Sequence, residues 1–206
     1  MNIIAFTDGS SIIKGDFYES SSAYIVTEDY KVVHSGGLYH ENGTNSKGEV
    51  YAFKECIDYI FDNYDVNEID KITIVSDSMY VVKSVNSWIY KWAKNDWKAS
   101  NGEDIKFKDV FIYLYNNYLM RGKRNKKIKV YHIKSHIKHT QKTRREFQFI
   151  NDIDISWHDY KLLAWFNDKV DKLANKIRDS KGQHNISNTD ILEKENGRII
   201  IKGRLI

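Results

Sequence analysis

The 206-residue sequence contains no proline, whereas average usage would supply about ten. Together with abundant Lys, Asn, Ile and Tyr, this absence is typical of an AT-rich genome and carries no functional information. The single cysteine, Cys56, excludes an internal disulfide framework and a zinc site made of cysteines. It lies among apolar residues of a helical pattern, which favours a buried, unreactive thiol.

Long apolar runs are also missing, since none approaches the roughly 18 consecutive residues of a membrane span. The first strand-like run begins at Ile3 and leaves no room for a targeting segment. At 41% hydrophobic and 14% aromatic residues, the chain can nevertheless bury a sizeable core, and its length indicates one domain with an extension. We therefore expect a soluble, cytoplasmic protein.

The net charge of +4 is small, but the basic residues are unevenly distributed. Between Arg121 and Arg145 there are eleven Lys or Arg residues and no Asp or Glu. A basic stretch of this density indicates binding to a polyanion. The competing interpretation is a solvated surface without a partner, and the charge pattern alone leaves both open.

Strand-like and helix-like patterns alternate along the chain. Strands are expected at 3–8, 23–27, 31–38, 71–76 and 127–134, and helices at 46–64, from 79 onward, at 88–98, 108–120 and 160–179. Polar loops are expected up to residue 22 and again before residue 159. This order predicts an α/β fold with a five-stranded mixed sheet, three antiparallel strands then two parallel ones, and helices on both faces.

Three acidic residues fall at equivalent places in this pattern. Asp8 and Asp77 each end a strand, and Glu49 lies in the first turn of a helix. Each has a structural alternative: an Asx turn at Asp8, a capping box between Ser46 and Glu49, and an N-cap at Asp77. Three clustered carboxylates are costly unless cations neutralise them, so the set favours a site for Mg²⁺ or Mn²⁺.

These residues belong to a larger ordered set of motifs that resembles a type 1 ribonuclease H over about residues 3–178. The matching motifs are Thr7-Asp8-Gly9-Ser10, Thr44-Asn45-Ser46-Lys47-Gly48-Glu49, Ser76-Asp77-Ser78-Met79-Tyr80-Val81, Trp88-Ile89-Tyr90-Lys91-Trp92 with Asp96-Trp97-Lys98, His132-Ile133-Lys134-Ser135-His136, and Asn167-Asp168-Lys169-Val170-Asp171-Lys172-Leu173-Ala174. One such motif is weak evidence, but the set in this order is specific.

The resemblance implies a ribonuclease H-like fold and an endonuclease that cuts the RNA strand of RNA–DNA hybrids, leaving 5′-phosphate and 3′-hydroxyl ends. It implies two Mg²⁺ ions, with Mn²⁺ as a substitute, and an auxiliary histidine at His136. The metal ligands that it implies are Asp8, Glu49, Asp77 and Asp171. Asp168, one turn before Asp171, is the competing acid, and the spacing before Leu-Ala favours Asp171. A zinc site at His132, His136 and His139 is a weaker alternative, because the surroundings are basic.

The resemblance also implies contacts with the hybrid. No protein partner is implied, and we expect a monomer. The residues at the matching positions are Gly9, Ser10, Thr44, Asn45, Trp88, Trp92 and Lys98. Met79 stands where many family members carry a polar residue that contacts the substrate. Most of the tryptophans are expected in the core, with one or two near the substrate.

The largest departure from compact family members is the distance of 35 positions from His136 to Asp171. We expect a catalytic domain at 1–180, an insertion at about 137–159, and an extension at 181–206 that forms a small hairpin. Within the insertion, a mobile basic loop over 138–145 is expected to bind phosphates through Lys142, Arg144 and Arg145. The competing view pairs this basic half with the acids at 146, 152, 154 and 159.

Two other functions stay open at this stage. One is a DNA-processing nuclease of the same superfamily, against which the Asn45 region and the tryptophan segment argue. The other is a non-catalytic nucleic-acid-binding module, against which the presence of all four acids argues.

Overall fold

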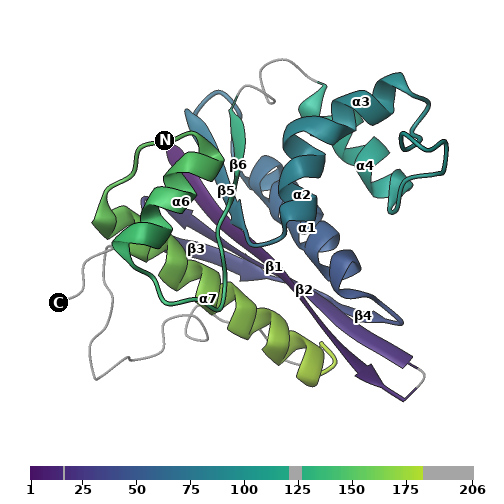
Figure 1. Ribbon diagram of the computed structural model, residues 1–206, viewed down its shortest axis with the longest axis horizontal. Coiled ribbons are helices and arrows are strands. Elements are labelled where there is room, and N and C mark those ends of the chain that lie inside the picture. Colours follow the sequence, from purple (N-terminus) through teal and green to yellow (C-terminus); the bar gives the residue numbers. More distant parts are fainter. Residues whose placement is uncertain (16, 121–126, 183–206) are drawn as a thin grey trace.

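A computed structural model describes residues 1–15, 17–120 and 127–182, and its centre is a mixed β-sheet (Figure 1). Along the sheet the strands follow the order β3-β2-β1-β5-β6. Their bounds are Asn2–Lys14 for β1, Phe17–Glu28 for β2, Lys31–Gly36 for β3, Lys71–Ser76 for β5 and Ile128–His132 for β6. The first three pair antiparallel, whereas β5 is parallel to β1 and to β6. The predicted five-stranded arrangement is confirmed, and a short strand β4, Tyr39–Glu41, pairs in addition with β2.

The helices lie between and after the strands. Their bounds are Asn45–Asn63 for α1, Met79–Lys83 for α2, Ile89–Lys94 for α3, Lys108–Leu114 for α4, Gln141–Asn151 for α6 and Trp157–Asp179 for α7, with π-helical turns at Ser84–Trp88 and Tyr115–Leu119. In the described ranges, no helix combines the length and the apolar character needed to cross a membrane.

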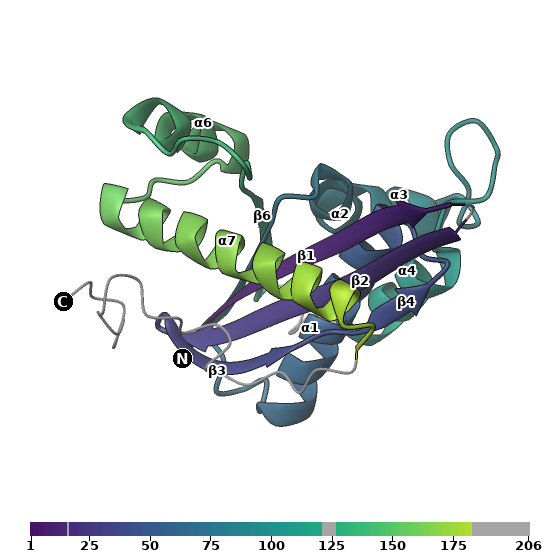
Figure 2. The same cartoon turned by 90° about the horizontal axis from the view of Figure 1, so that it is seen from below.

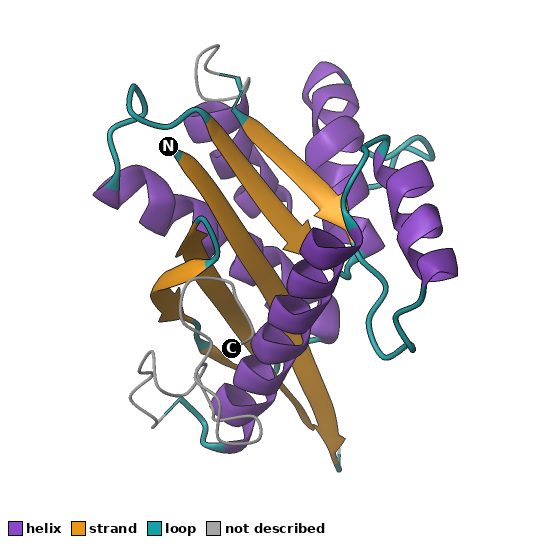
Figure 3. Cartoon of the chain, turned by 90° about the vertical axis from the view of Figure 1, so that its left-hand side faces the viewer, coloured by secondary structure: helices purple, strands orange, loops and turns teal. Residues whose placement is uncertain are grey.

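Different helices cover the two faces of the sheet, as predicted (Figure 3). Side chains alternate along β1, so that Ile3 and Ala5 join the core under α1. Phe6 points to the opposite face, where its ring stacks on Phe166 of α7 at a centroid distance of 4.8 Å. Cys56, on the buried face of α1, lies in the same core as Ile3 and Ala5, and burial raises the pKa of its thiol, as expected for an unreactive cysteine.

The first hairpin is longer than the sequence pattern indicates. The predicted polar loop up to residue 22 is wrong, because β1 continues to Lys14 and β2 begins at Phe17. The polar run belongs to a buried part of β2, in which Ser21 donates a hydrogen bond to the Ala174 carbonyl at 2.6 Å. This hydrogen bond satisfies the buried Ser21 hydroxyl where β2 packs against α7. Asp8 therefore lies within β1 and pairs with Ala23, rather than standing in a turn.

Neither capping role suggested for the acids exists. Thr44, not Ser46, is the N-cap of α1, and Glu49 lies beyond the first turn of that helix. Ser78, not Asp77, is the N-cap of α2. At both helix starts a hydroxyl oxygen accepts a hydrogen bond from a backbone N–H group. The carboxyl groups of Glu49 and Asp77 are therefore available for another function.

The insertion is a helix rather than a loop. Gln141–Asn151 forms α6, which lies beside the first half of α7 (Figure 2). Thr140 and Thr143 form its capping box, and Phe147 is its buried anchor. α7 itself begins at Trp157, three residues earlier than predicted. Most of the expected 138–145 loop is therefore helical. One buried apolar residue and a threonine cap are enough to stabilise a short helix that packs against the rest of the protein. The predicted hairpin of the 181–206 extension falls outside the described residues.

Candidate active site

Two of the predicted acids lie at the same level of two neighbouring parallel strands. The pairing of β1 with β5 ends at Thr7 and Ser76, and the next residues along the chain are Asp8 and Asp77. Strand alternation places both on the face that α7 covers, since they follow the register of Phe6 and Val75 in that core. The register of β1 with β5 therefore places these two residues side by side, as predicted.

Glu49 joins them because two glycines allow the start of α1 to press against the sheet. A methyl group on Gly9 would lie 2.3 Å from the backbone nitrogen of Glu49. A methyl group on Gly48 would lie 2.2 Å from the backbone oxygen of Ser21. Gly9, for which the resemblance suggested a nucleic-acid contact, thus has a packing role as well. Gly48 was missed as a site residue, although a glycine inside a helical pattern is a usual sign of close approach.

Both carboxylate oxygens of Glu49 are held by hydrogen bonds. The Ser78 hydroxyl donates to Oε2 at 2.6 Å, and the Asn45 amide donates to Oε1 at 2.8 Å. Burial raises the pKa of Glu49, the bond from Ser78 lowers it, and the nearby charge of Asp77 raises it. Asn45, predicted as a nucleic-acid contact, therefore also orients an acid of the site.

The fourth acid, Asp171, comes from the middle of α7. Its carboxyl group is near enough to Asp8 to raise the pKa of Asp8 electrostatically. Asn175, one turn later, donates to the Asp171 carbonyl oxygen at 2.9 Å and to its Oδ1 at 3.3 Å. Asp168 lies elsewhere on the helix: its side chain is 52% exposed and pairs with Lys172 at 2.8 Å. The geometry thus favours Asp171 over Asp168.

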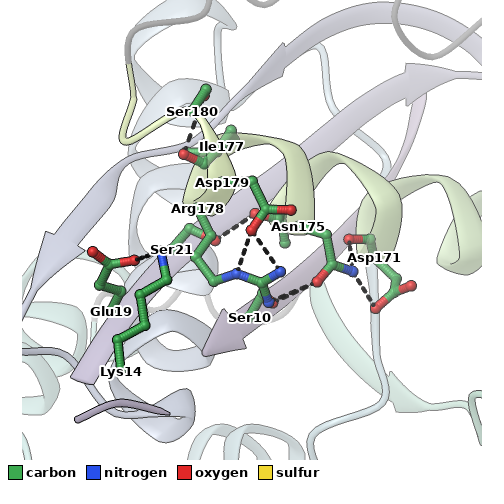
Figure 4. Close-up of polar contacts among 11 residues, drawn as sticks. Ser10, Lys14, Glu19, Ser21, Asp171, Asn175, Ile177, Arg178, Asp179 and Ser180 are labelled. Atoms are coloured by element: carbon green, nitrogen blue, oxygen red, sulfur yellow. Dashed lines mark hydrogen bonds and ion pairs between the residues drawn. The ribbon is translucent and has the colours of Figure 1, made fainter. Parts of the chain in front are cut away.

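A polar network ties this part of α7 to β1 (Figure 4). The Ser10 hydroxyl donates to the side-chain oxygen of Asn175 at 2.8 Å, and Arg178 donates to both Ser10 and Asn175. Asp179 in turn holds the Arg178 guanidinium. Ser10, predicted to contact nucleic acid, is therefore engaged within the protein. Sequence reasoning missed Asn175, although its position four residues after Asp171 places both on one helix face.

Asp8 is at the electrostatic centre of the four acids. Its pKa is raised well above the ordinary value, first by burial and then by the charges of Asp77, Asp171 and Glu49. The Gly9 N–H, 2.8 Å from Asp8 Oδ1, acts in the opposite direction. Across the described ranges, no three His, Cys, Asp or Glu side chains already surround a single point as ligands. The donors nevertheless fit a hard divalent cation, since all are carboxylate oxygens whose mutual repulsion a cation would offset.

His136 stands at the edge of this group. Its backbone is left-handed, with φ of 53°, and its side chain is 75% exposed. The Nε2 atom lies 4.0 Å from Asp171 Oδ1. An exposed imidazole at this distance can exchange protons with solvent beside the acids.

The three histidines of the zinc alternative do not converge. His132 is buried, and its Nε2 lies 3.1 Å from the carbonyl oxygen of Asp77. The Nδ1 atom of His139 lies 3.0 Å from the Tyr160 hydroxyl. Each ring is thus engaged separately, which does not support a zinc site formed with His136.

The tryptophan segment forms a groove. Trp88, Trp92 and Lys98 line a hollow of about 520 Å³ together with Lys91 and Asn95. The expected helix over 88–98 is too long, because α3 ends at Lys94 and Lys98 forms a β-bridge with Asp104. The change of structure brings Lys98 back toward the two indole rings. Three predicted nucleic-acid contacts are therefore brought together.

The three residues of the insertion that are predicted to bind phosphates lie on α6 and differ in exposure. Lys142 and Arg145 are exposed, whereas Arg144 is half-buried and donates to the Ile155 carbonyl at 3.1 Å. Arg144 thus braces the connection to α7. Glu146 pairs at 2.7 Å with Lys134, which lies outside the insertion.

The comparisons with known proteins agree on one family. A model of the ribonuclease H family, described as RNase H, matches residues 1–146. The chain is 30% identical over 128 residues to ribonuclease H of Caldicellulosiruptor saccharolyticus, covering 62% of this chain and 82% of that protein. It is 37% identical over 75 residues to a probable ribonuclease H of Acanthamoeba polyphaga mimivirus, covering 36% of this chain and 32% of the viral protein. The match thus spans about a third of that relative.

Solved structures share the fold. A foamy viral protease-reverse transcriptase in complex with RNA/DNA hybrid superposes with a TM-score of 0.59 at 18% identity, covering 84% of this chain and 19% of that one. A type 1 RNase H with the type 2 active-site motif superposes with a TM-score of 0.60 at 14% identity, covering 87% and 73%. These structures therefore share the fold of the chain. The chain belongs to the ribonuclease H family and is of type 1. The family match ends before α7, so the assignment of Asp171 depends on the geometry described above.

Proposed function

We propose that this chain is an endonuclease that hydrolyses the RNA strand of RNA–DNA hybrids and leaves 5′-phosphate and 3′-hydroxyl ends. The observation that carries the proposal is the convergence of four carboxyl groups, from β1, α1, α7 and the end of β5, at one edge of the sheet. The structure of a foamy viral neighbour with RNA/DNA hybrid supports the choice of substrate. Family membership supports the reaction class.

Asp8, Glu49, Asp77 and Asp171 would hold two Mg²⁺ ions, with Mn²⁺ as a substitute. When bound, such ions stabilise charge on the scissile phosphate and lower the pKa of an attacking water. Asp8 has the central position, since the other three acids all act on it. Ser78 and Asn45 fix the orientation of Glu49, so its carboxylate is preorganised for this role.

His136 acts as a proton carrier in this scheme. Its imidazole is exposed and lies 4.0 Å from Asp171, which places it between the acids and solvent. We assign it to proton movement during hydrolysis or to release of the product. Loss of His136 should therefore slow turnover without abolishing the reaction.

Substrate recognition divides among three surfaces in this proposal. The groove of Trp88, Trp92 and Lys98 offers indole rings and a cation to the DNA strand. Thr44 and Asn45, both exposed at the start of α1, offer polar groups to the 2′-hydroxyls of the RNA strand. Met79, in the first turn of α2, cannot donate a comparable hydrogen bond. Lys142 and Arg145 on α6 are further candidates for phosphate contacts.

We further propose that residues 1–180 are the catalytic domain, with the 137–159 insertion as part of it. In this proposal the protein acts as a cytoplasmic monomer without a protein partner. Gel filtration coupled to light scattering checks the oligomeric part: a mass near the 24.3 kDa of the chain is expected, and twice that mass would contradict it.

Cleavage of a labelled RNA–DNA hybrid, compared with single-stranded RNA, duplex RNA and duplex DNA, tests the proposed function. Mg²⁺-dependent cutting confined to the RNA strand of the hybrid is the expected result. Cutting of duplex DNA would favour a DNA-processing nuclease, and tight binding without cutting would favour a non-catalytic module. Mass spectrometry of the fragments identifies the ends.

A further inference from the structure

A cavity of about 650 Å³ lies between the Ser135–His139 segment and α7. Its apolar wall includes Ile137, Leu162, Ala164 and Trp165. His136 and Asp171 also line it, so the cavity opens onto the proposed catalytic site. Its volume is typical of sites for small organic ligands. The proposed hydrolysis of a phosphodiester uses none of the apolar residues named here.

Two buried polar atoms around this cavity have no hydrogen-bond partner among the described residues. They are the side-chain oxygen of Asn167, a residue only 4% exposed, and the indole nitrogen of Trp165. Both residues line the cavity. Leaving such groups unpaired is unfavourable, so native proteins rarely do so without a reason. One group accepts a hydrogen bond and the other donates one.

The insertion and the first half of α7 build and brace this cavity. Tyr160 packs against Phe147 of α6, and its hydroxyl lies 3.0 Å from His139 Nδ1, which anchors the Ser135–His139 segment. On the other side, the Lys169 ammonium lies over the Trp165 ring at 4.9 Å from the centroid. The indole therefore has a fixed orientation at the cavity wall.

The chemistry of the wall matches one nucleotide. A nucleobase is flat and apolar on its faces and carries donors and acceptors on one edge, which suits Trp165, Asn167 and the aliphatic wall. Lys161 and His158, both exposed, place cationic or polar groups at the rim for a phosphate. Among the described residues that line the cavity, the acids are Asp171, in the catalytic group, and Asp168, which is paired with Lys172.

We propose that this cavity binds the base and ribose of one unpaired nucleotide, supplied by the nucleic-acid strand whose phosphate occupies the acidic site. The proposal depends on the proposed function for the source of the nucleotide, but not for binding itself. A free nucleotide has the same chemistry, and the experiments below distinguish the two sources.

The first test measures binding without hydrolysis. AMP and UMP are titrated into the full chain in EDTA, and the indole N–H resonance of Trp165, assigned with Trp165→Phe, is followed by NMR. The expected result is a saturable shift of this resonance, with affinity about tenfold weaker in Asn167→Leu because one hydrogen bond is lost. Lys176→Ala, exposed on the same helix outside the cavity lining, is the control and should bind normally. No shift at millimolar nucleotide, or equal affinity in Asn167→Leu, would overturn the proposal.

Thermal unfolding of Asn167→Leu separates a binding role from a structural one. Replacing an unpaired buried amide with an apolar group of similar size should leave the midpoint unchanged or raise it. Weaker nucleotide binding in a variant that is at least as stable is therefore the expected combination. If Asn167→Leu does not fold, Lys161→Ala, at an exposed position, provides the same comparison through the phosphate.

The second test identifies the source of the nucleotide. Cleavage of a blunt hybrid is compared with cleavage of hybrids carrying one unpaired ribonucleotide at either RNA end. The expected result is a KM about fivefold to tenfold lower for one overhang, lost in Asn167→Leu, with blunt-hybrid cleavage unchanged. AMP binding without an overhang preference would assign the cavity to a free nucleotide. Failure to cleave any hybrid would reject the proposed function and leave the NMR result as the test of the cavity.

Discussion

Asn175 fixes Asp171 from one helical turn away. Its amide nitrogen donates to Asp171 Oδ1 at 3.3 Å and to the Asp171 carbonyl oxygen at 2.9 Å. Its amide oxygen accepts from Ser10 and Arg178, so the carboxyl group on α7 is joined to β1 through one side chain (Figure 4). The last acid of the site is thus oriented by a residue that touches neither substrate nor metal in the proposed scheme.

Replacing Asn175 with alanine should lower kcat for hybrid cleavage by about tenfold to a hundredfold, as for other partners that orient metal ligands. Affinity for the hybrid in EDTA should be unchanged. Asn63→Ala is the matched control, because Asn63 also donates to the carbonyl four residues earlier but lies at the far end of α1. Equal kcat values for the two variants would show that Asp171 needs no such support.

Gly48→Ala should destabilise the protein, although alanine normally favours a helix by about 1 kcal/mol. The added methyl group would lie 2.2 Å from the Ser21 carbonyl oxygen and would push α1 away from the sheet. We expect a loss of about 1–3 kcal/mol in the free energy of unfolding, with slower cleavage because Glu49 moves. Urea denaturation gives the first quantity. Ser46→Ala, two residues earlier in α1, should change neither, and a stabilised Gly48→Ala variant would contradict the close packing.

Asp171→Asn should reduce Mg²⁺-dependent cleavage about a hundredfold or more, since it removes a charge from the acidic group. Asp168→Asn should stay within about threefold of the unmodified enzyme, because it loses only an exposed ion pair with Lys172. Single-turnover rates at saturating hybrid compare the two directly. Comparable losses in both variants would mean that the register assigned on α7 is wrong.

Glu55 makes stability depend on pH away from the site. Burial raises its pKa to about 7, against the opposing hydrogen bond from Ser22. The folded protein therefore keeps a proton that the unfolded chain releases near its ordinary pKa of about 4.3, so raising the pH through this window lowers stability. Glu55→Gln should flatten the fall in unfolding free energy over this window, measured by urea denaturation. Glu68→Gln, at an exposed position, should retain the full slope, and a parallel slope in Glu55→Gln would exclude this source.

Much of the sheet follows from local patterns. The run at β5 and the apolar stripe of α1 predict those elements within a residue, because burial selects apolar residues at the matching period. The buried serines at the start of β2 could not be predicted, since their partners, Glu55 and Ala174, are distant in sequence. α6 was not predicted for a similar reason, because its stability depends on the packing of Phe147 against Tyr160 of α7.

The site shows the same division. Asp8 and Asp77 carry a visible signal, because each comes after an apolar run and the runs pair as parallel strands. Only Asp77 follows the end of its strand, since β1 continues past Asp8 to Lys14. Asp171 has no local signal in a helix with many charges, and only the family motif and the packed helix select it. The contact of Ser78 with Glu49 depends on three-dimensional placement, because the two residues are 29 positions apart. The contact of Asn175 with Asp171 does follow a helical spacing, but the sequence does not show that Asp171 is the residue to start from.

The central claim is that Asp8 and the three carboxyl groups around it form the site that cleaves the RNA strand of a hybrid, and Asp8→Asn tests it most directly. The substitution keeps the size of the side chain and removes the central charge, which lies in a group built from β1, α1, α7 and the end of β5. Single-turnover cleavage and hybrid binding are measured together on the same preparation in Mg²⁺. The account predicts that cleavage is abolished while binding to the hybrid is largely retained. Residual cleavage within about tenfold of the unmodified enzyme would contradict the assignment of this site.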